Sequence, residues 1–180
     1  MSCEPWQCAE IAATKKANPI QKPDIVVAMI KKAKRPILVV GSYAVERYME
    51  GKLLIEYLID FARASKVPVV ATAHMVGEFL KRGYTPAGFM SAMDIGNRLV
   101  DPEWKGLDGK GPYDLALFVG MPYYMEGLIL CGLKHFAPDL RTITLDNLFH
   151  PHASWSFPNA TLEDWAGNLK VMTSKFEGGQ

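Results

Sequence analysis

Residues 37–41 read Ile-Leu-Val-Val-Gly, a continuous apolar run that ends at a glycine. Such a run, with no polar alternation, is typical of a strand buried on both faces of a parallel sheet. Two later segments share the pattern: 67–71 reads Val-Pro-Val-Val-Ala, and 115–119 reads Leu-Ala-Leu-Phe-Val and again precedes a glycine. Together they predict the centre of a parallel β-sheet.

Segments with helical spacing separate these runs. Residues 51–66 place Leu54, Leu58 and Phe61 on one stripe and charged residues on the opposite one. Further helices are expected after Pro23, at 74–81, around 93–99, after 122 and after Thr161, where Asp164 completes a capping box. Strands are also expected near Gly88, at 140–145 and, as an edge strand, at 155–157. We therefore predict an α/β fold, a three-layer Rossmann-like doubly wound parallel sheet.

The length of 180 residues fits one such domain, over 23–180, because single cores of this size are common. Residues 1–22 show no strong periodicity and are expected to be an N-terminal arm that orders on a partner. The long segment 101–112, rich in glycine and proline, is expected to be a surface loop.

The composition excludes several classes of protein. Twenty basic and nineteen acidic residues give a net charge of +1, which argues against binding to nucleic acid. No apolar run is long enough to cross a membrane, and the N-terminus lacks the features of a secretory signal. Three cysteines do not form a disulfide framework, so the expected location is cytoplasmic.

A ligand in an open parallel sheet is expected outside the carboxyl ends of the strands, at the point where the strand order reverses. Glycines there let a ligand approach the backbone, and an aspartate can accept hydrogen bonds from ribose hydroxyls. Glycine after a buried strand is equally ordinary turn chemistry. The candidate cofactor-binding residues are Gly41, Ser42, Thr72, His74, Gly120, Met121 and Asp146.

Motifs of self-sufficient enzymes are missing. Gly41 is followed by Ser-Tyr-Ala-Val-Glu rather than by the dinucleotide-binding glycine pattern, and no phosphate-binding loop motif occurs. Three cysteines cannot supply four thiolates to an iron–sulfur cluster, and His150 with His152 lacks a third ligand at convincing spacing. We therefore predict no metal or iron–sulfur cluster of the chain's own and no catalytic residues, and hence an accessory role.

Aromatic and apolar side chains also gather outside the predicted core. The helix after 122 is expected to bury a face that includes Leu128 and Phe136, which leaves Leu130 beside Glu126 and Lys134 on the outer side. Tyr123, Tyr124, Trp104, Phe149 and Trp155 are expected outside the core as well. Such groups either mark an interface or pack under long loops.

Two resemblances add to this reading. Residues 33–41, 67–72 and 114–120 resemble the central domain of thiamine-diphosphate enzymes such as acetohydroxyacid synthase, a domain that binds FAD in some members and nothing in others. The thiamine-binding domains that flank it in those enzymes are absent from this sequence, so the resemblance does not imply their catalysis.

The second resemblance covers nearly the whole chain after the arm. Residues 34–42, 141–146, 153–159 and above all 101–114, Asp-Pro-Glu-Trp-Lys-Gly-Leu-Asp-Gly-Lys-Gly-Pro-Tyr-Asp, resemble the epsilon subunit of the archaeal acetyl-CoA decarbonylase/synthase complex. The resemblance implies a partner, the large nickel–iron–sulfur alpha subunit with carbon monoxide dehydrogenase activity, in an alpha2-epsilon2 type assembly. It also implies two candidate roles, stabilising that assembly or assisting electron transfer to FAD.

Three hypotheses follow, and self-association stays open in all of them. The first is a non-catalytic subunit of a carbon monoxide dehydrogenase component, with a vestigial or working flavin crevice. The second is an independent flavin- or nucleotide-binding oxidoreductase. The third is a scaffold whose crevice is filled by its own side chains, such as Tyr43 and Met121.

Overall fold

A computed structural model describes residues 16–72 and 74–178. The elements are β1 (Asn18–Pro19), α1 (Pro23–Lys32), β2 (Pro36–Val40), the 3-10 helix η1 (Ser42–Val45), β3 (Tyr48–Met49), β4 (Lys52–Leu53), α2 (Leu54–Ser65), β5 (Val69–Thr72), α3 (Met75–Lys81), β6 (Gly88–Met90), α4 (Ala92–Val100), β7 (Leu115–Val119), α5 (Tyr123–Phe136), β8 (Arg141–Thr144), β9 (Trp155–Ser156) and α6 (Leu162–Glu177).

The central sheet of the described residues has the order β1-β9-β8-β7-β2-β5-β6, and every pair of neighbouring strands is parallel. The chain first winds outward from β2 through β5 to β6, and then returns to β7, on the other side of β2, to wind outward again. This is the strand order of a doubly wound Rossmann-like sheet, and it confirms the predicted fold class. The order reverses between β2 and β7.

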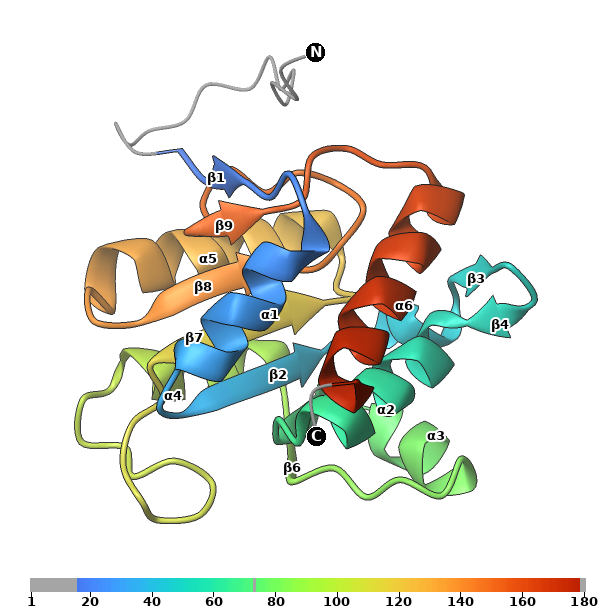
Figure 1. Ribbon diagram of the computed structural model, residues 1–180. Helices are drawn as coiled ribbons and strands as arrows, with labels where there is room; N and C mark the ends of the chain where they lie inside the picture. The colour runs from blue at the N-terminus through green and yellow to red at the C-terminus, as the bar shows by residue number, and fades with distance from the viewer. Residues whose placement is uncertain (1–15, 73, 179–180) are drawn as a thin grey trace.

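Helices cover both faces of the sheet, as Figure 1 shows. One core contains residues of α1, α2 and α6 together with Leu38 and Val40 of β2, whereas the other contains residues of α4 and α5 together with Ile37 and Val39. Because successive side chains of a strand point to opposite faces, the unbroken apolar run of β2 supplies both cores. No helix among the described residues is long and apolar enough to span a membrane.

The start of the domain differs from the expectation. The segment after residue 16 was predicted to belong to an arm, yet β1 pairs with β9, and Ile20 is buried in the core beside α1. The N–H of Ile20 donates to the carbonyl of Ser156 at 2.8 Å. β1 is thus the outer strand and β9 lies inside it, rather than at the edge. Residues 1–15 of the predicted arm lie outside the described residues.

Helix α5 is rotated relative to the prediction. Leu128 and Phe136, expected in the core, are about 70% exposed (67% and 70%), whereas Leu130 and Glu126, expected on the outer side, are completely buried. The buried stripe of α5 consists of Glu126, Ile129, Leu130 and Leu133, so apolar packing of the last three carries Glu126 into the interior. Phe149, expected outside the core, is also buried.

Other predicted details are confirmed or refined. Thr161 caps α6, since its Oγ1 accepts a hydrogen bond from the N–H of Asp164 at 3.1 Å. Leu162, at the start of this helix, is exposed. Residues 101–114 form a loop in which Trp104 packs against Tyr113, with ring centroids 5.6 Å apart.

Candidate functional site

The first turns after β2 and β7 meet at the point where the strand order reverses. The N–H of Gly41 donates to the carbonyl of Val119 at 2.9 Å, and the N–H of Tyr43 donates to the carbonyl of Gly120 at 2.8 Å. Gly120 has a positive φ of 72°, a conformation that favours glycine, and it lets the chain turn back toward Gly41. The two turns are therefore hydrogen-bonded directly to each other.

The contact between these turns leaves no space at Gly41. A β-carbon built on Gly41 would lie 2.3 Å from the carbonyl oxygen of Gly120 and 2.5 Å from Cγ of Met121. Met121 itself is buried. Gly41 therefore admits another part of the same chain, as the scaffold hypothesis expects for Met121, and its role in binding a cofactor stays a prediction.

A small cavity lies beside this contact, with a volume of about 40 Å³. A water molecule needs roughly 10–15 Å³ by this kind of measure, so the cavity has room for water-sized groups. Gly41 and Gly120 are in direct contact, and FAD binding stays a prediction from the resemblance. The lining residues are Tyr43, Arg47, Gly120, Met121, Tyr123, Asp146, Asn147, Leu148, His150 and Trp165.

The predicted site residues are only partly brought together. Gly120, Met121 and Asp146 line the cavity, and Gly41 touches two of them. Ser42 begins η1 and does not line the cavity, although its neighbour Tyr43 does. Thr72 is buried at the end of β5, and His74 is exposed just before α3; neither belongs to the residues that line this cavity.

Asp146 follows β8 and fixes the turn after β7. Both of its carboxylate oxygens accept a hydrogen bond from the N–H of Gly120, at 2.9 and 3.1 Å. Burial raises the pKa of Asp146, and the N–H of Gly120 opposes that effect because it stabilises the charged form. Asp146 thus makes a structural hydrogen bond within the chain, and its role in binding ribose hydroxyls stays a prediction.

Beneath α5, Asp146 meets two further ionisable side chains, Glu126 and His150. One ligand atom from each of the three lies within 4.8 Å of the others, and Oε2 of Glu126 is 3.7 Å from Nε2 of His150. Burial is the main reason that the pKa of Glu126 is raised well above its usual range, and the charge of Asp146 adds to it. Burial lowers the pKa of His150 to about 4, so its imidazole is neutral at neutral pH.

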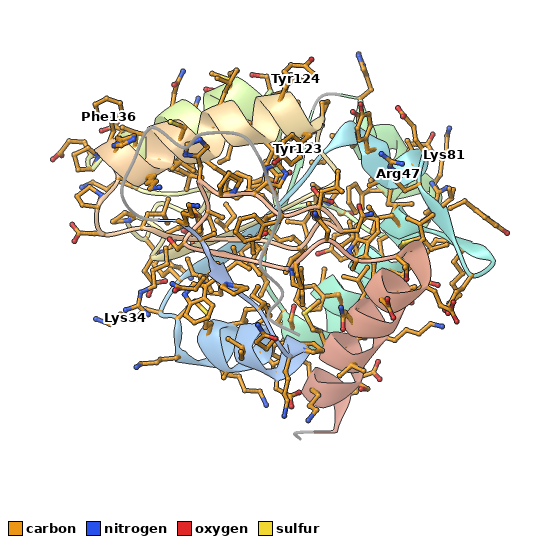
Figure 2. The ribbon with its side chains drawn as sticks, turned by 90° about the horizontal axis from the view of Figure 1, so that it is seen from above. Lys34, Arg47, Lys81, Tyr123, Tyr124 and Phe136 are labelled. Atoms are coloured by element: carbon orange, nitrogen blue, oxygen red, sulfur yellow. The ribbon has the colours of Figure 1, made fainter. Side chains whose placement is uncertain are left out.

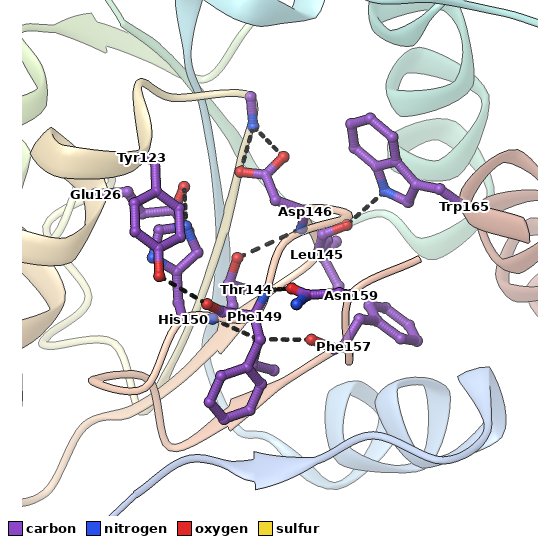
Figure 3. Close-up of polar contacts among 12 residues, drawn as sticks. Tyr123, Glu126, Thr144, Leu145, Asp146, Phe149, His150, Phe157, Asn159 and Trp165 are labelled. Atoms are coloured by element: carbon purple, nitrogen blue, oxygen red, sulfur yellow. Dashed lines mark hydrogen bonds and ion pairs between the residues drawn. The ribbon is translucent and has the colours of Figure 1, made fainter. Parts of the chain in front are cut away.

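Aromatic residues enclose this cluster (Figure 3). The ring of Tyr123 stacks on His150 with centroids 4.2 Å apart, and its hydroxyl donates to the carbonyl of Phe149 at 2.9 Å. On the other side of the cavity, Nε1 of Trp165 donates to the carbonyl of Leu145 at 2.6 Å. These contacts hold the segment 145–150 against the sheet and keep the cluster away from bulk solvent.

Glu126 and His150 were missed as a pair by the sequence reasoning. Glu126 reads as a solvent-facing residue of an amphipathic helix, and His150 was considered only with His152. The available signal was Leu130, an apolar residue one turn after Glu126, since residues four apart share a helix face. A stripe that pairs a large apolar residue with a carboxylate indicates either an exposed leucine or a buried glutamate, and here the glutamate is buried.

Comparison with known proteins identifies the family. A family model described as CO dehydrogenase beta subunit/acetyl-CoA synthase epsilon subunit matches residues 1–173. The chain is 38% identical over 172 residues to the acetyl-CoA decarbonylase/synthase complex subunit epsilon of Methanothermobacter thermautotrophicus, covering 93% of each chain. It is 37% identical over 158 residues to subunit epsilon 1 of Archaeoglobus fulgidus, covering 87% of this chain and 82% of the relative. The chain therefore belongs to the family of CO dehydrogenase beta subunits and acetyl-CoA synthase epsilon subunits.

Proposed function

We propose that this chain is an accessory subunit of an acetyl-CoA decarbonylase/synthase complex, and that it binds and stabilises the large nickel–iron–sulfur alpha subunit. The observation that carries the proposal is its similarity, over nearly its whole length, to proteins named as epsilon subunits of that complex. A stabilising role needs no catalytic residues in this chain. It needs a folded surface that a larger partner can cover.

The outer face of α5 offers such a surface. Tyr124, Leu128 and Phe136 are each more than two-thirds exposed, and Met93 of the adjacent helix α4 is half exposed. Figure 2 shows Tyr124 and Phe136 projecting from α5 away from the rest of the molecule. Large apolar side chains gathered on one face are more common at interfaces than on free surfaces. We propose that this face of α4 and α5, the α5 face, meets the partner.

The test is co-purification of the untagged chain with the tagged alpha subunit after co-expression. Leu128→Asp places a charge in the middle of the α5 face and is expected to weaken binding at least tenfold, because a desolvated charge opposes burial. Val171→Asp is the matched control, since Val171 is a partly exposed apolar residue on α6, in the opposite layer. Equal loss of binding in both variants, or in neither, contradicts the assignment of this face.

The stabilising role has its own measurement. The half-life of the alpha subunit at elevated temperature is expected to lengthen when the chain is present, because a ligand that binds only the folded state stabilises it. Leu128→Asp should abolish that gain. An alpha subunit that binds the chain and decays no more slowly would leave the pairing intact and contradict the stabilising role.

Assistance of electron transfer to FAD is the other role that the resemblance implies. The direct contact between the turns at Gly41 and Gly120 weighs against a flavin between β2 and β7. Fluorescence titration of FAD, with the chain alone and with the partner, tests it. Saturable binding that quenches flavin fluorescence would support a role in electron transfer to FAD. No saturable binding, either alone or with the partner, would contradict that role.

A further inference from the structure

Glu126, Asp146 and His150 form a buried cluster with unsatisfied polar atoms. Neither carboxylate oxygen of Glu126 has a partner at hydrogen-bond distance among the described residues, although Asp146 and Thr144 are near enough to shift its pKa. Glu126 is completely buried and His150 is 1% exposed. Buried polar atoms are nearly always paired, so the two unpaired oxygens of Glu126, with Nε2 of His150 only 3.7 Å from Oε2, indicate a group that satisfies them.

The side-chain types are those of a metal centre. Two carboxylates and one neutral imidazole can each give a lone pair, and metal ions of the zinc type bind both kinds of group. With bonds of about 2.0–2.2 Å, two ligand atoms on a tetrahedral ion lie about 3.4 Å apart. Oε2 of Glu126 and Nε2 of His150 are 3.7 Å apart, and all three ligand atoms lie within 4.8 Å. Small side-chain adjustments would bring them into bonding distance.

We propose that Glu126, Asp146 and His150 bind one divalent transition-metal ion of the zinc type. The site draws its ligands from three elements: Glu126 from α5, Asp146 from the turn after β8, and His150 from the loop before β9. Three protein ligands leave at least one coordination position for water or another small ligand. Asp146 and His150 line the cavity of about 40 Å³, which provides the space for it.

Charge supports the same assignment. Two carboxylates in a buried space repel each other, and burial together with the charge of Asp146 raises the pKa of Glu126. A divalent cation between them offsets both charges. Asp146 can bind the ion and still accept from the N–H of Gly120, because each carboxylate oxygen has two lone pairs. Metal binding here does not depend on the partner proposed above.

A bound proton is the competing explanation. If Glu126 is protonated, the cluster holds one negative charge and needs no ion. The two explanations make different predictions for the isolated chain. If Glu126 holds a proton, the cluster does not bind Zn²⁺. If the cluster is a metal centre, the chain binds an ion, becomes more stable and shows the spectrum of the bound metal.

The experiment uses the untagged full chain, stripped of metal with a chelator and titrated with Zn²⁺ and with Co²⁺ as an optical probe. The background carries Cys3→Ser, Cys8→Ser and Cys131→Ser, which removes binding through thiols. We expect one ion per chain, Co²⁺ absorption bands that Zn²⁺ abolishes, and a higher thermal midpoint with Zn²⁺. Glu126→Gln keeps the side-chain volume and is expected to weaken binding roughly tenfold or more, as is His150→Gln.

The matched controls are Glu163→Gln and His135→Gln, which change an exposed glutamate and an exposed histidine outside the cluster. Both should bind Zn²⁺ as the parent does. The proposal is overturned if the parent chain shows no saturable binding of either ion, whatever the variants do. It is equally overturned if the controls lose as much affinity as Glu126→Gln and His150→Gln, because the ion would then bind elsewhere.

Discussion

Gly41 sits where two loops approach so closely that a single β-carbon would not fit. The atoms that such a carbon would meet first are the backbone of Gly120 and the side chain of Met121, and the backbone cannot move away without breaking its hydrogen bond to Tyr43. The glycine is therefore required by packing within the chain. This differs from the ligand-binding reason for which a glycine at a strand end is first suspected.

Gly41→Ala is expected to destabilise the protein by about 2 kcal/mol, the usual penalty for forcing atoms into a filled site. Gly127→Ala is the control, because a β-carbon there meets nothing within 4 Å and the residue lies inside α5. It should stabilise the protein by about 0.5–1 kcal/mol through the better helix propensity of alanine. Urea denaturation measures both changes, and a neutral Gly41→Ala would show that the turns can separate at little cost.

The sequence located part of the site because strand ends are visible in it. Gly41, Gly120, Met121 and Asp146 follow apolar runs, and parallel strands bring such residues to one edge. Thr72 and His74 also lie at the end of a strand, but that strand is β5, which is on the opposite side of β2 from β7. Glu126 and His150 could not be found this way, since they reach the site from a helix and a loop whose orientation only the packed structure decides.

At the scale of elements, β1 shows how a short segment can belong to a fold without carrying a pattern. Two strand residues are too few to display periodicity, and Pro19 argues against a strand except at an edge. The edge is where β1 lies. Its pairing with β9 anchors Ile20 in the core that α1 and α6 share. The domain thus begins before residue 23.

Ile20→Ala tests this boundary. Truncation of a fully buried isoleucine is expected to cost about 2–5 kcal/mol, from lost apolar burial and the cavity left behind. An arm that ordered only on a partner would instead leave the stability of the isolated chain unchanged. Val171→Ala, at a partly exposed position, should change the unfolding free energy by less than about 0.5 kcal/mol in the same denaturation assay.

The loop 101–114 is held to the sheet by two aspartates. Asp114 accepts hydrogen bonds from the N–H groups of Lys34 and Arg35, each at 2.8 Å. The guanidinium of Arg35 pairs with Asp108 at 2.5 Å and lies 5.0 Å from the centre of the Tyr113 ring. Arg35 therefore joins the middle of the loop to its C-terminal end, which helps to explain why a segment so rich in glycine has a defined conformation.

The ion pair between Arg35 and Asp108 predicts how the stability of the protein depends on pH. The hydrogen bond from Arg35 lowers the pKa of Asp108 from 3.8 to about 2. A carboxyl whose pKa is depressed by folding stabilises the folded state above its unfolded pKa, and this contribution is lost as the pH falls toward the folded pKa. Thermal midpoints of the parent and Asp108→Asn should therefore differ at pH 6 and converge at about pH 2. A gap that stayed constant with pH would contradict the pairing.

At the scale of the whole molecule, the two hydrophobic cores share the same strands. Residues 37–40 of β2 and 115–119 of β7 contribute alternately to the core under α1, α2 and α6 and to the core under α4 and α5. Neither layer of helices can leave without exposing one face of those strands to water. The apolar runs that first indicated a parallel sheet therefore also couple its two faces.

Coupled cores should unfold together. Trp165 reports on the layer of α6, and Trp104 reports on the layer of α4 and α5. In variants that keep only one of these tryptophans, with the others replaced by phenylalanine, the fluorescence midpoint in urea is expected to coincide with the far-UV circular dichroism midpoint of the same variant. Comparison within each variant removes the effect of the lost hydrogen bond when Trp165 is replaced. Separate midpoints would mean that one helical layer detaches while the sheet persists, contrary to the shared strands.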